Sequence, residues 1–508
     1  MGIFGRRGGR LLARATVAAA ALAASAALAV SAGLAAAQAK EKVLTLAFDV
    51  KAVSLDPATS AERTTTVLSA QFYDTLVARD EKGQFVPRLA TGWTVPSPTE
   101  WVFALRKDVT LHDGRPFTAR DVKFTLDRYR DPANTSPMAS FYTFLEAIEV
   151  RDDHTIALRT KEPTGTVLTS LAVTPILGEK AGVNWASQVY GTGPFTLVEF
   201  RRGEQVVMAK NPRYWGRAAR IDRAVWKEIP EQATRLTALE RGDLDLVVGL
   251  NAEDLPRLKA NPDITVVQAP TYRIRWLWLH AGKKPFDDPR VRRAIKHAID
   301  MRSLVRDLMG DMAVPATGPL APNVFGFTPG APFRYDPSLA RALLREAGYP
   351  NGFEVSMDFP LAETKQKEVA VTIAAHLAEV GVTARLRQKD RAIWLKDLTG
   401  LDWDMNLFAH STLGGDADYT QRRVFISSAN RTGYANPELD RWLVEASRHA
   451  EPARRLEAYR RANDILWTDG PVVYLFVHTQ GYAYGPRVSS FKPPADDLIK
   501  LVDVDLRP

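Results

Sequence analysis

The pattern of hydrophobic and polar positions predicts a strand, a turn and a helix in that order over residues 92–128. Alternate residues share one face of a strand, and here that face carries Trp101, Phe103 and Leu105. The His-Asp-Gly sequence at 112–114 is typical of a turn, because glycine frees the backbone and aspartate offers a local hydrogen bond. A helix is expected to begin after Thr118, with Asp121 in its first turn as in a capping box. Its apolar stripe consists of Val122, Leu126 and Tyr129.

Other helices are marked by their ends. A proline follows an N-cap residue at three predicted starts, which are Asp288-Pro289, Asp336-Pro337 and Asn436-Pro437. Gly348 ends the second of these helices, and Gly242 ends another that is predicted over residues 234–241. Helical and strand patterns interleave along the chain, and this order predicts α/β lobes.

The strand predicted over residues 272–280 carries the most unusual side chains. Alternation places one aromatic-rich set on a single face, namely Ile274, Trp276, Trp278 and His280. Aromatic walls bury ligand surface while their N–H groups bond polar atoms, so this face is a candidate ligand wall. The alternative is that it packs in a core. An imidazole at the end of the strand could also make a pH-sensitive contact.

The first 39 residues predict a signal peptide. A basic segment precedes the small, apolar stretch 15–37, and Ala-Gln-Ala at 37–39 supplies a cleavage site before Lys40. An uncleaved anchor helix is the alternative, since the apolar stretch is long enough to span a bilayer. The rest of the chain is long enough to require two or three lobes.

The amino-acid composition excludes several kinds of functional site. The chain has no cysteine, which excludes disulfides, thiolate metal sites, a cysteine nucleophile and a lipid-modified N-terminal cysteine. The formal net charge is +8, but four leader arginines account for half of it and the remaining excess is spread along the sequence. A nucleic-acid groove needs clustered basic residues, so no nucleic-acid partner is expected.

The sequence lacks common motifs of catalysis and metal binding. The sequence contains no GxSxG, HExxH or Walker motif, and no two of its eight histidines have the i, i+4 spacing of a helical metal site. We therefore predict no catalytic residue, no metal and no cofactor. An exported hydrolase acting on peptides or glycans remains the alternative.

Nine further segments, together with residues 92–128, resemble in sequence and order the family 5 extracytoplasmic solute-binding proteins, the peptide- and nickel-type receptors of ABC importers. The segments are SLDPAT at Ser54, YDTLV at Tyr73, VPRLATGW at Val86, GTGPFTL at Gly191, NPRYWG at Asn211, ALERGDLDL at Ala238, PFDDPRVRRAIKHAID at Pro285, YDPSLARALLREAGYPNGF at Tyr335 and NPELDRWLVEA at Asn436.

The resemblance implies an α/β, two-lobed periplasmic-binding-protein fold of type II, cluster C, with an extra domain and a discontinuous first lobe. The parts are here called lobe I (40–70, 185–272 and 478–508), the extra domain (71–184) and lobe II (273–477). It also implies a periplasmic, monomeric receptor that closes on a peptide-like or other small polar solute. The partners would be an inner-membrane ABC permease and its cytoplasmic ATPase. A nickel-chelate or oligosaccharide solute remains open.

The resemblance also points to a second candidate site. In peptide-binding relatives a loop carries an aspartate that pairs with the α-ammonium of the peptide. The corresponding residues 409–425 are rich in small and acidic residues and are predicted to form a loop. Asp416 or Asp418 is the candidate carboxylate, with a plain turn role as the alternative. His280 stands where the family often has asparagine. Further candidate ligand contacts are Ser54, His410, Thr412, Tyr419 and Arg422.

Overall fold

A computed structural model of the chain provides the coordinates. It describes residues 41–507 except 49–50, 61–62, 81–83, 135, 137, 362–364, 495 and 497. The predicted signal peptide lies outside the described residues. No helix among the described residues has the length and apolar character needed to cross a membrane.

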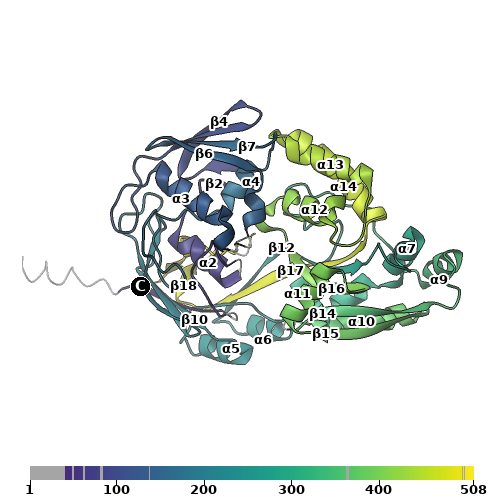
Figure 1. Ribbon diagram of the computed structural model, residues 1–508. Coiled ribbons are helices and arrows are strands. Elements are labelled where there is room, and N and C mark those ends of the chain that lie inside the picture. Colours follow the sequence, from purple (N-terminus) through teal and green to yellow (C-terminus); the bar gives the residue numbers. More distant parts are fainter. Residues whose placement is uncertain are drawn as a thin grey trace, which may run out of the picture.

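One mixed sheet of eleven strands runs through the molecule (Figure 1). Its strands are β1 (Val43–Phe48), β8 (Phe195–Arg201), β9 (Gln205–Lys210), β10 (Arg223–Glu228), β11 (Leu246–Val248), β12 (Thr265–Leu279), β13 (Ala313–Pro315), β14 (Phe353–Pro360), β15 (Val382–Lys389), β16 (Met405–Ser411) and β17 (Val472–Tyr484). They lie in the order β15-β14-β16-β12-β17-β11-β1-β10-β9-β8, with β13 also beside β17. The prediction of an α/β fold is confirmed.

Two long strands, β12 and β17, join the parts of this sheet. They pair antiparallel from Thr265 opposite Tyr484 to Pro270 opposite Thr479, and pairing resumes at Ile274 opposite Val477. The lobe I end of β17 also pairs with β11, whereas the lobe II end of β12 pairs with β16. Among the described strands, β12 and β17 therefore run through both lobes, and their ladder is interrupted at residues 271–273.

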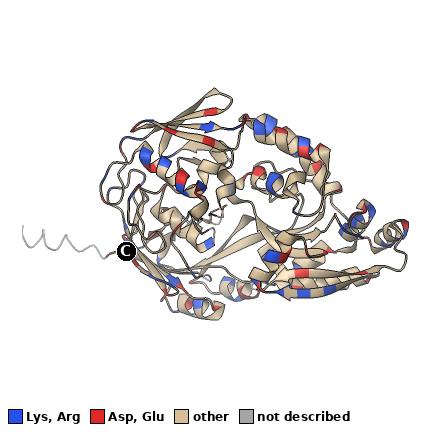
Figure 2. Ribbon diagram, viewed as in Figure 1, with Lys and Arg blue, Asp and Glu red and all other residues tan. Residues whose placement is uncertain are grey.

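Helices cover the sheet on both sides of this interruption. Lobe I carries α2 (Arg63–Phe72), whose last two residues lie beyond the predicted boundary at residue 70, and it carries α5 (Gln232–Glu240) and α6 (Leu255–Ala260). Lobe II carries α7 (Pro289–Ala298), α8 (Met301–Leu304), α9 (Pro337–Glu346), α10 (Gln366–Ala378), α11 (Arg391–Gly400), α12 (Ala417–Phe425), α13 (Pro437–Arg448) and α14 (Pro452–Thr468). Figure 2 shows acidic and basic residues mixed along the outer helices, the pattern of a solvated surface.

The extra domain has a sheet of its own, in the order β4-β5-β7-β6. Its elements are β2 (Val77–Arg79), β3 (Phe85–Pro87), β4 (Ala90–Ser97), β5 (Glu100–Leu105), α3 (Ala119–Arg130), β6 (Leu145–Asp152), β7 (Thr155–Thr160) and α4 (Val167–Ala172). The prediction for residues 92–128 is confirmed, because Trp101, Phe103 and Leu105 are buried. The backbone N–H of Thr118 donates to Asp121 at 2.8 Å, as the capping box requires.

The predicted helix starts are also confirmed. Asp288, Asp336 and Asn436 each accept a backbone hydrogen bond as N-caps of α7, α9 and α13. By contrast, the prediction of a loop over residues 409–425 was wrong. Strand β16 continues to Ser411, and α12 begins at Ala417 after a short turn, because the Asp416 carboxylate accepts from the backbone N–H of Asp418 and caps the helix.

Candidate functional site between the lobes

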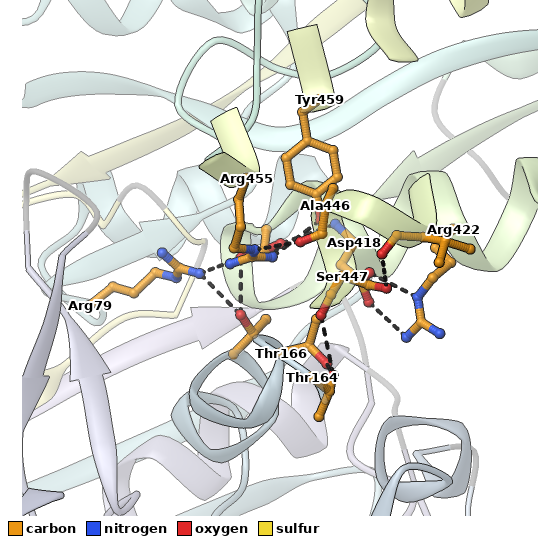
Figure 3. A network of polar contacts seen from close by, with 12 residues as sticks. Arg79, Thr164, Thr166, Asp418, Arg422, Ala446, Ser447, Arg455 and Tyr459 are labelled. Carbon is orange, nitrogen blue, oxygen red and sulfur yellow. Dashed lines mark hydrogen bonds and ion pairs between the residues drawn. The ribbon is translucent and has the colours of Figure 1, made fainter. Parts of the chain in front are cut away.

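A buried carboxylate, that of Asp416, lies where lobe II meets the extra domain. Its side chain has no exposed surface. Arg455 of α14 donates two hydrogen bonds, from Nη1 to Oδ2 at 3.0 Å and from Nη2 to Oδ1 at 2.7 Å. The extra domain supplies two more donors, Arg79 Nη2 at 2.7 Å and Thr169 Oγ1 at 2.9 Å. Figure 3 shows Arg79 and Arg455 within this network.

The electrostatics of this network favour the ionised carboxylate. Burial alone would raise the pKa of Asp416, but the nearby Arg455 and Arg79 guanidinium groups outweigh burial and hold the pKa below its ordinary value. Burial lowers the pKa of Arg79, with a further contribution from Arg455, and Asp416 opposes both. Two guanidinium groups thus share one carboxylate in a site that is largely closed to water.

The aromatic residues of β12 lie in the core of lobe II. Trp276, Trp278 and His280 are at most 4% exposed, so in this conformation the predicted ligand wall packs against protein. The His280 ring lies 5.0 Å from the Trp403 ring, centroid to centroid. Burial, with the nearby charge of Lys283 second, lowers the pKa of His280, which keeps the imidazole neutral.

A stack of aromatic rings leads from this core towards the extra domain. Trp276 and His410 stack at a centroid distance of 4.4 Å, and His410 and Tyr419 at 6.0 Å. Tyr419 then stacks on Phe141 of the extra domain at 4.8 Å. Burial, and secondarily the charge of Arg423, lowers the pKa of His410 to about 3, so this ring is uncharged near neutral pH.

The remaining predicted residues lie at two separate places. Thr412 is buried, and its hydroxyl bonds that of Thr420 at 2.8 Å beside the ring stack. Asp418 pairs with Arg422 through two hydrogen bonds of 2.9 and 3.0 Å on α12. Ser54 lies in lobe I, where its hydroxyl accepts from the backbone N–H of Asp56 at 3.1 Å and fixes a turn.

The structure therefore brings together His410, Thr412, Asp416, Asp418, Tyr419 and Arg422 around α12, and places Ser54 elsewhere. Sequence reasoning missed Arg79, Thr169 and Arg455, the side-chain partners of Asp416. For Arg455 a local pattern was available. It occupies the buried stripe of α14 with Ala458, Tyr459, Ala462 and Leu466, and an arginine on an apolar stripe needs a buried partner.

Within the described residues, no three His, Asp or Glu side chains come close enough to hold a metal ion. What the arrangement around α12 does provide is a set of contacts that joins lobe II to the extra domain.

Comparisons with known proteins agree with one another. The family model described as bacterial extracellular solute-binding proteins, family 5 Middle, matches residues 84–431. The glutathione-binding protein GsiB of Escherichia coli O1:K1 / APEC is 28% identical over 488 residues, which are 92% of this chain and 95% of that protein.

Solved structures extend the likeness over almost the whole fold. The ABC transporter-associated periplasmic binding protein DppA from Helicobacter pylori, in complex with the peptide STSA, is 27% identical with a TM-score of 0.80, covering 91% of this chain and 98% of that one. NikZ from Campylobacter jejuni, in complex with Ni(L-His), shares the fold at 20% identity and a TM-score of 0.78, covering 92% and 100%. The predicted two-lobed fold is thereby confirmed.

Proposed function

The chain belongs to the bacterial extracellular solute-binding proteins of family 5, and we propose that its solute is a short, peptide-like molecule of the glutathione class. Proteins of this family serve ABC importers. The similarity to GsiB and to a peptide-bound DppA supports a peptide-like solute over other small polar molecules. We further propose that the mature protein is a monomer in the periplasm.

One structural observation supports the proposed mechanism. The lobes share a sheet through β12 and β17, and the pairing of these strands is interrupted at residues 271–273. Such a break in the pairing of two strands can absorb the backbone rotation of a hinge, while the segments on each side of it move as rigid bodies. The solute would bind between the lobes and favour the closed form by contacting both.

We propose that the solute meets the turn between β16 and α12. Ser411 is exposed and Leu413 is half-buried, so both are accessible at this turn. Tyr419, half-buried beside them, would cover an apolar part of the solute. Asp416 would hold the turn in place without contacting the solute, because its carboxylate already accepts hydrogen bonds from four protein groups.

The proposed receptor does no chemistry on its solute. The closed form would dock on the permease, and the ATPase in the cytoplasm would supply the energy of transport. Release would follow reopening of the hinge, with the solute unchanged.

Calorimetric titration of the purified mature chain tests this function. The ligands would be reduced glutathione, di- to tetrapeptides, a nickel–histidine chelate and an oligosaccharide. We expect glutathione or a tripeptide to bind at micromolar concentration and to stabilise the fold by about 2.7 kcal/mol at a hundredfold excess over Kd. Binding of the nickel chelate or the oligosaccharide alone, or a changed solute mass after incubation, would overturn the proposal.

A further inference from the structure

Among the described residues, the contacts between the extra domain and lobe II include three at separate places. Arg79 and Thr169 donate to Asp416, and Phe141 stacks on Tyr419. The third contact lies at the end of α13, where the backbone N–H of Gly165 donates to the carbonyl oxygen of Ser447 at 2.7 Å. Figure 3 shows the chain at Thr164 and Thr166 lying against this end of α13.

Gly165 makes this third contact possible. A Cβ atom at this position would overlap the main-chain carbonyl oxygen of His449, which belongs to lobe II. The backbone of Gly165 lies outside the left-handed region, so alanine would fit the local chain conformation. The absence of a side chain at Gly165 is therefore needed for the approach of lobe II and not for the fold of the extra domain.

The hydrogen-bond donors to Asp416 are divided between lobe II and the extra domain, so the two parts can separate. Arg455 and the backbone N–H of Asp418 belong to lobe II and would stay with the carboxylate if the lobes separated. Arg79 and Thr169 belong to the extra domain and would leave with it. The open form would thus keep a bidentate ion pair on the buried carboxylate, and Arg79 would gain water. Neither form leaves an uncompensated buried charge.

We propose that the extra domain is a latch that holds this receptor closed, with Arg79, Phe141 and Gly165 as its contact points. The proposal deepens the proposed function, since the closed form is the one that would retain the solute. These contacts form between protein groups alone. The latch therefore gives the empty receptor a substantial closed population. It also lowers the free energy that solute binding must supply to close the receptor.

A long-range distance measurement tests the latch. Because the chain has no cysteine, the exposed Lys107 of the extra domain and Lys396 of lobe II can be replaced by cysteine and labelled at these two sites alone. In this background Gly165→Ala would block closure. Gly92→Ala is the matched control, since a Cβ atom at Gly92 meets nothing within 4 Å.

Without solute, we expect the parent and Gly92→Ala proteins to show mainly the short, closed distance, and Gly165→Ala to show mainly a longer one. Arg79→Ala should give a mixture. The apparent solute affinity should fall with the closed fraction, by about tenfold for Gly165→Ala if one tenth remains closed. A closed distance in Gly165→Ala, or an open distance in the unliganded parent, would overturn the latch. The distances decide this even if the proposed solute fails to bind, and solute binding by a protein without a latch would leave the proposed function standing.

Discussion

The carboxylate of Asp416 is hydrogen-bonded to other groups of the protein. Both oxygens accept hydrogen bonds, and the two guanidinium groups beside them are themselves mostly buried. Removing the negative charge leaves those cations without compensation in a site that water does not reach. We expect Asp416→Asn to destabilise the protein by about 3 kcal/mol in urea unfolding. Asp418→Asn is the control, because its partner Arg422 is 41% exposed and can be hydrated once the carboxylate charge is removed, so we expect a smaller loss. Equal losses would contradict this assignment.

The same residue predicts a response to acid. The pKa of Asp416 is lower in the folded protein than in the unfolded chain, where it is about 3.9. The contribution of Asp416 to the free energy of unfolding is therefore complete above the unfolded pKa and is lost as the pH falls through the folded pKa. Measured between about pH 2 and 6, the free energy of unfolding should fall below about pH 4 and fall less steeply in Asp416→Asn. An identical slope would show that other carboxylates cause the acid transition.

At the scale of elements, local sequence signals predicted several helix starts. Asp336 caps α9 by accepting from the backbone N–H of Leu339 at 2.8 Å. Asp336→Ala should cost about 1 kcal/mol of stability in thermal or urea unfolding. The neighbouring exposed residue Ser338 offers a control, and Ser338→Ala should change stability by less than about 0.5 kcal/mol. A negligible effect of Asp336→Ala would mean that tertiary packing alone fixes this helix end.

Where partners of Asp416 were missed, the cause was distance along the chain. The α/β pattern, the caps and the segment 92–128 each follow from residues within a few positions of one another. Asp416 meets Arg79 across 337 positions and Thr169 across 247, and nothing in the local pattern points to either. The segment 409–425 was assigned to a loop because its small and acidic residues resemble turn composition, although one of those acids is a helix cap. The solute contacts also depend on residues that are far apart in the sequence, so their placement stays a prediction.

At the scale of the whole molecule, the predicted leader can be tested by mass. Cleavage after Ala39 should give a mature protein that begins at Lys40 and appears in the periplasmic fraction. Intact-mass measurement of the protein isolated from that fraction checks this expectation, and Ala37→Leu with Ala39→Leu should block processing. A full-length mass in the membrane fraction of the unmodified protein would instead support an anchor helix.

The position of β17 has a consequence for the export that the leader sequence predicts. This strand lies between β12 and β11 in the sheet, yet it is synthesised after residues 273–471, which are almost all of lobe II. The sheet of lobe I therefore has a missing member until residues 472–484 emerge from the ribosome, and its early strands have no complete surface to fold onto. A nascent polypeptide whose N-terminal half cannot complete its fold before the C-terminal segment is synthesised stays unfolded for longer. For an exported chain, that delay gives the translocation machinery time to engage it before a stable structure blocks passage.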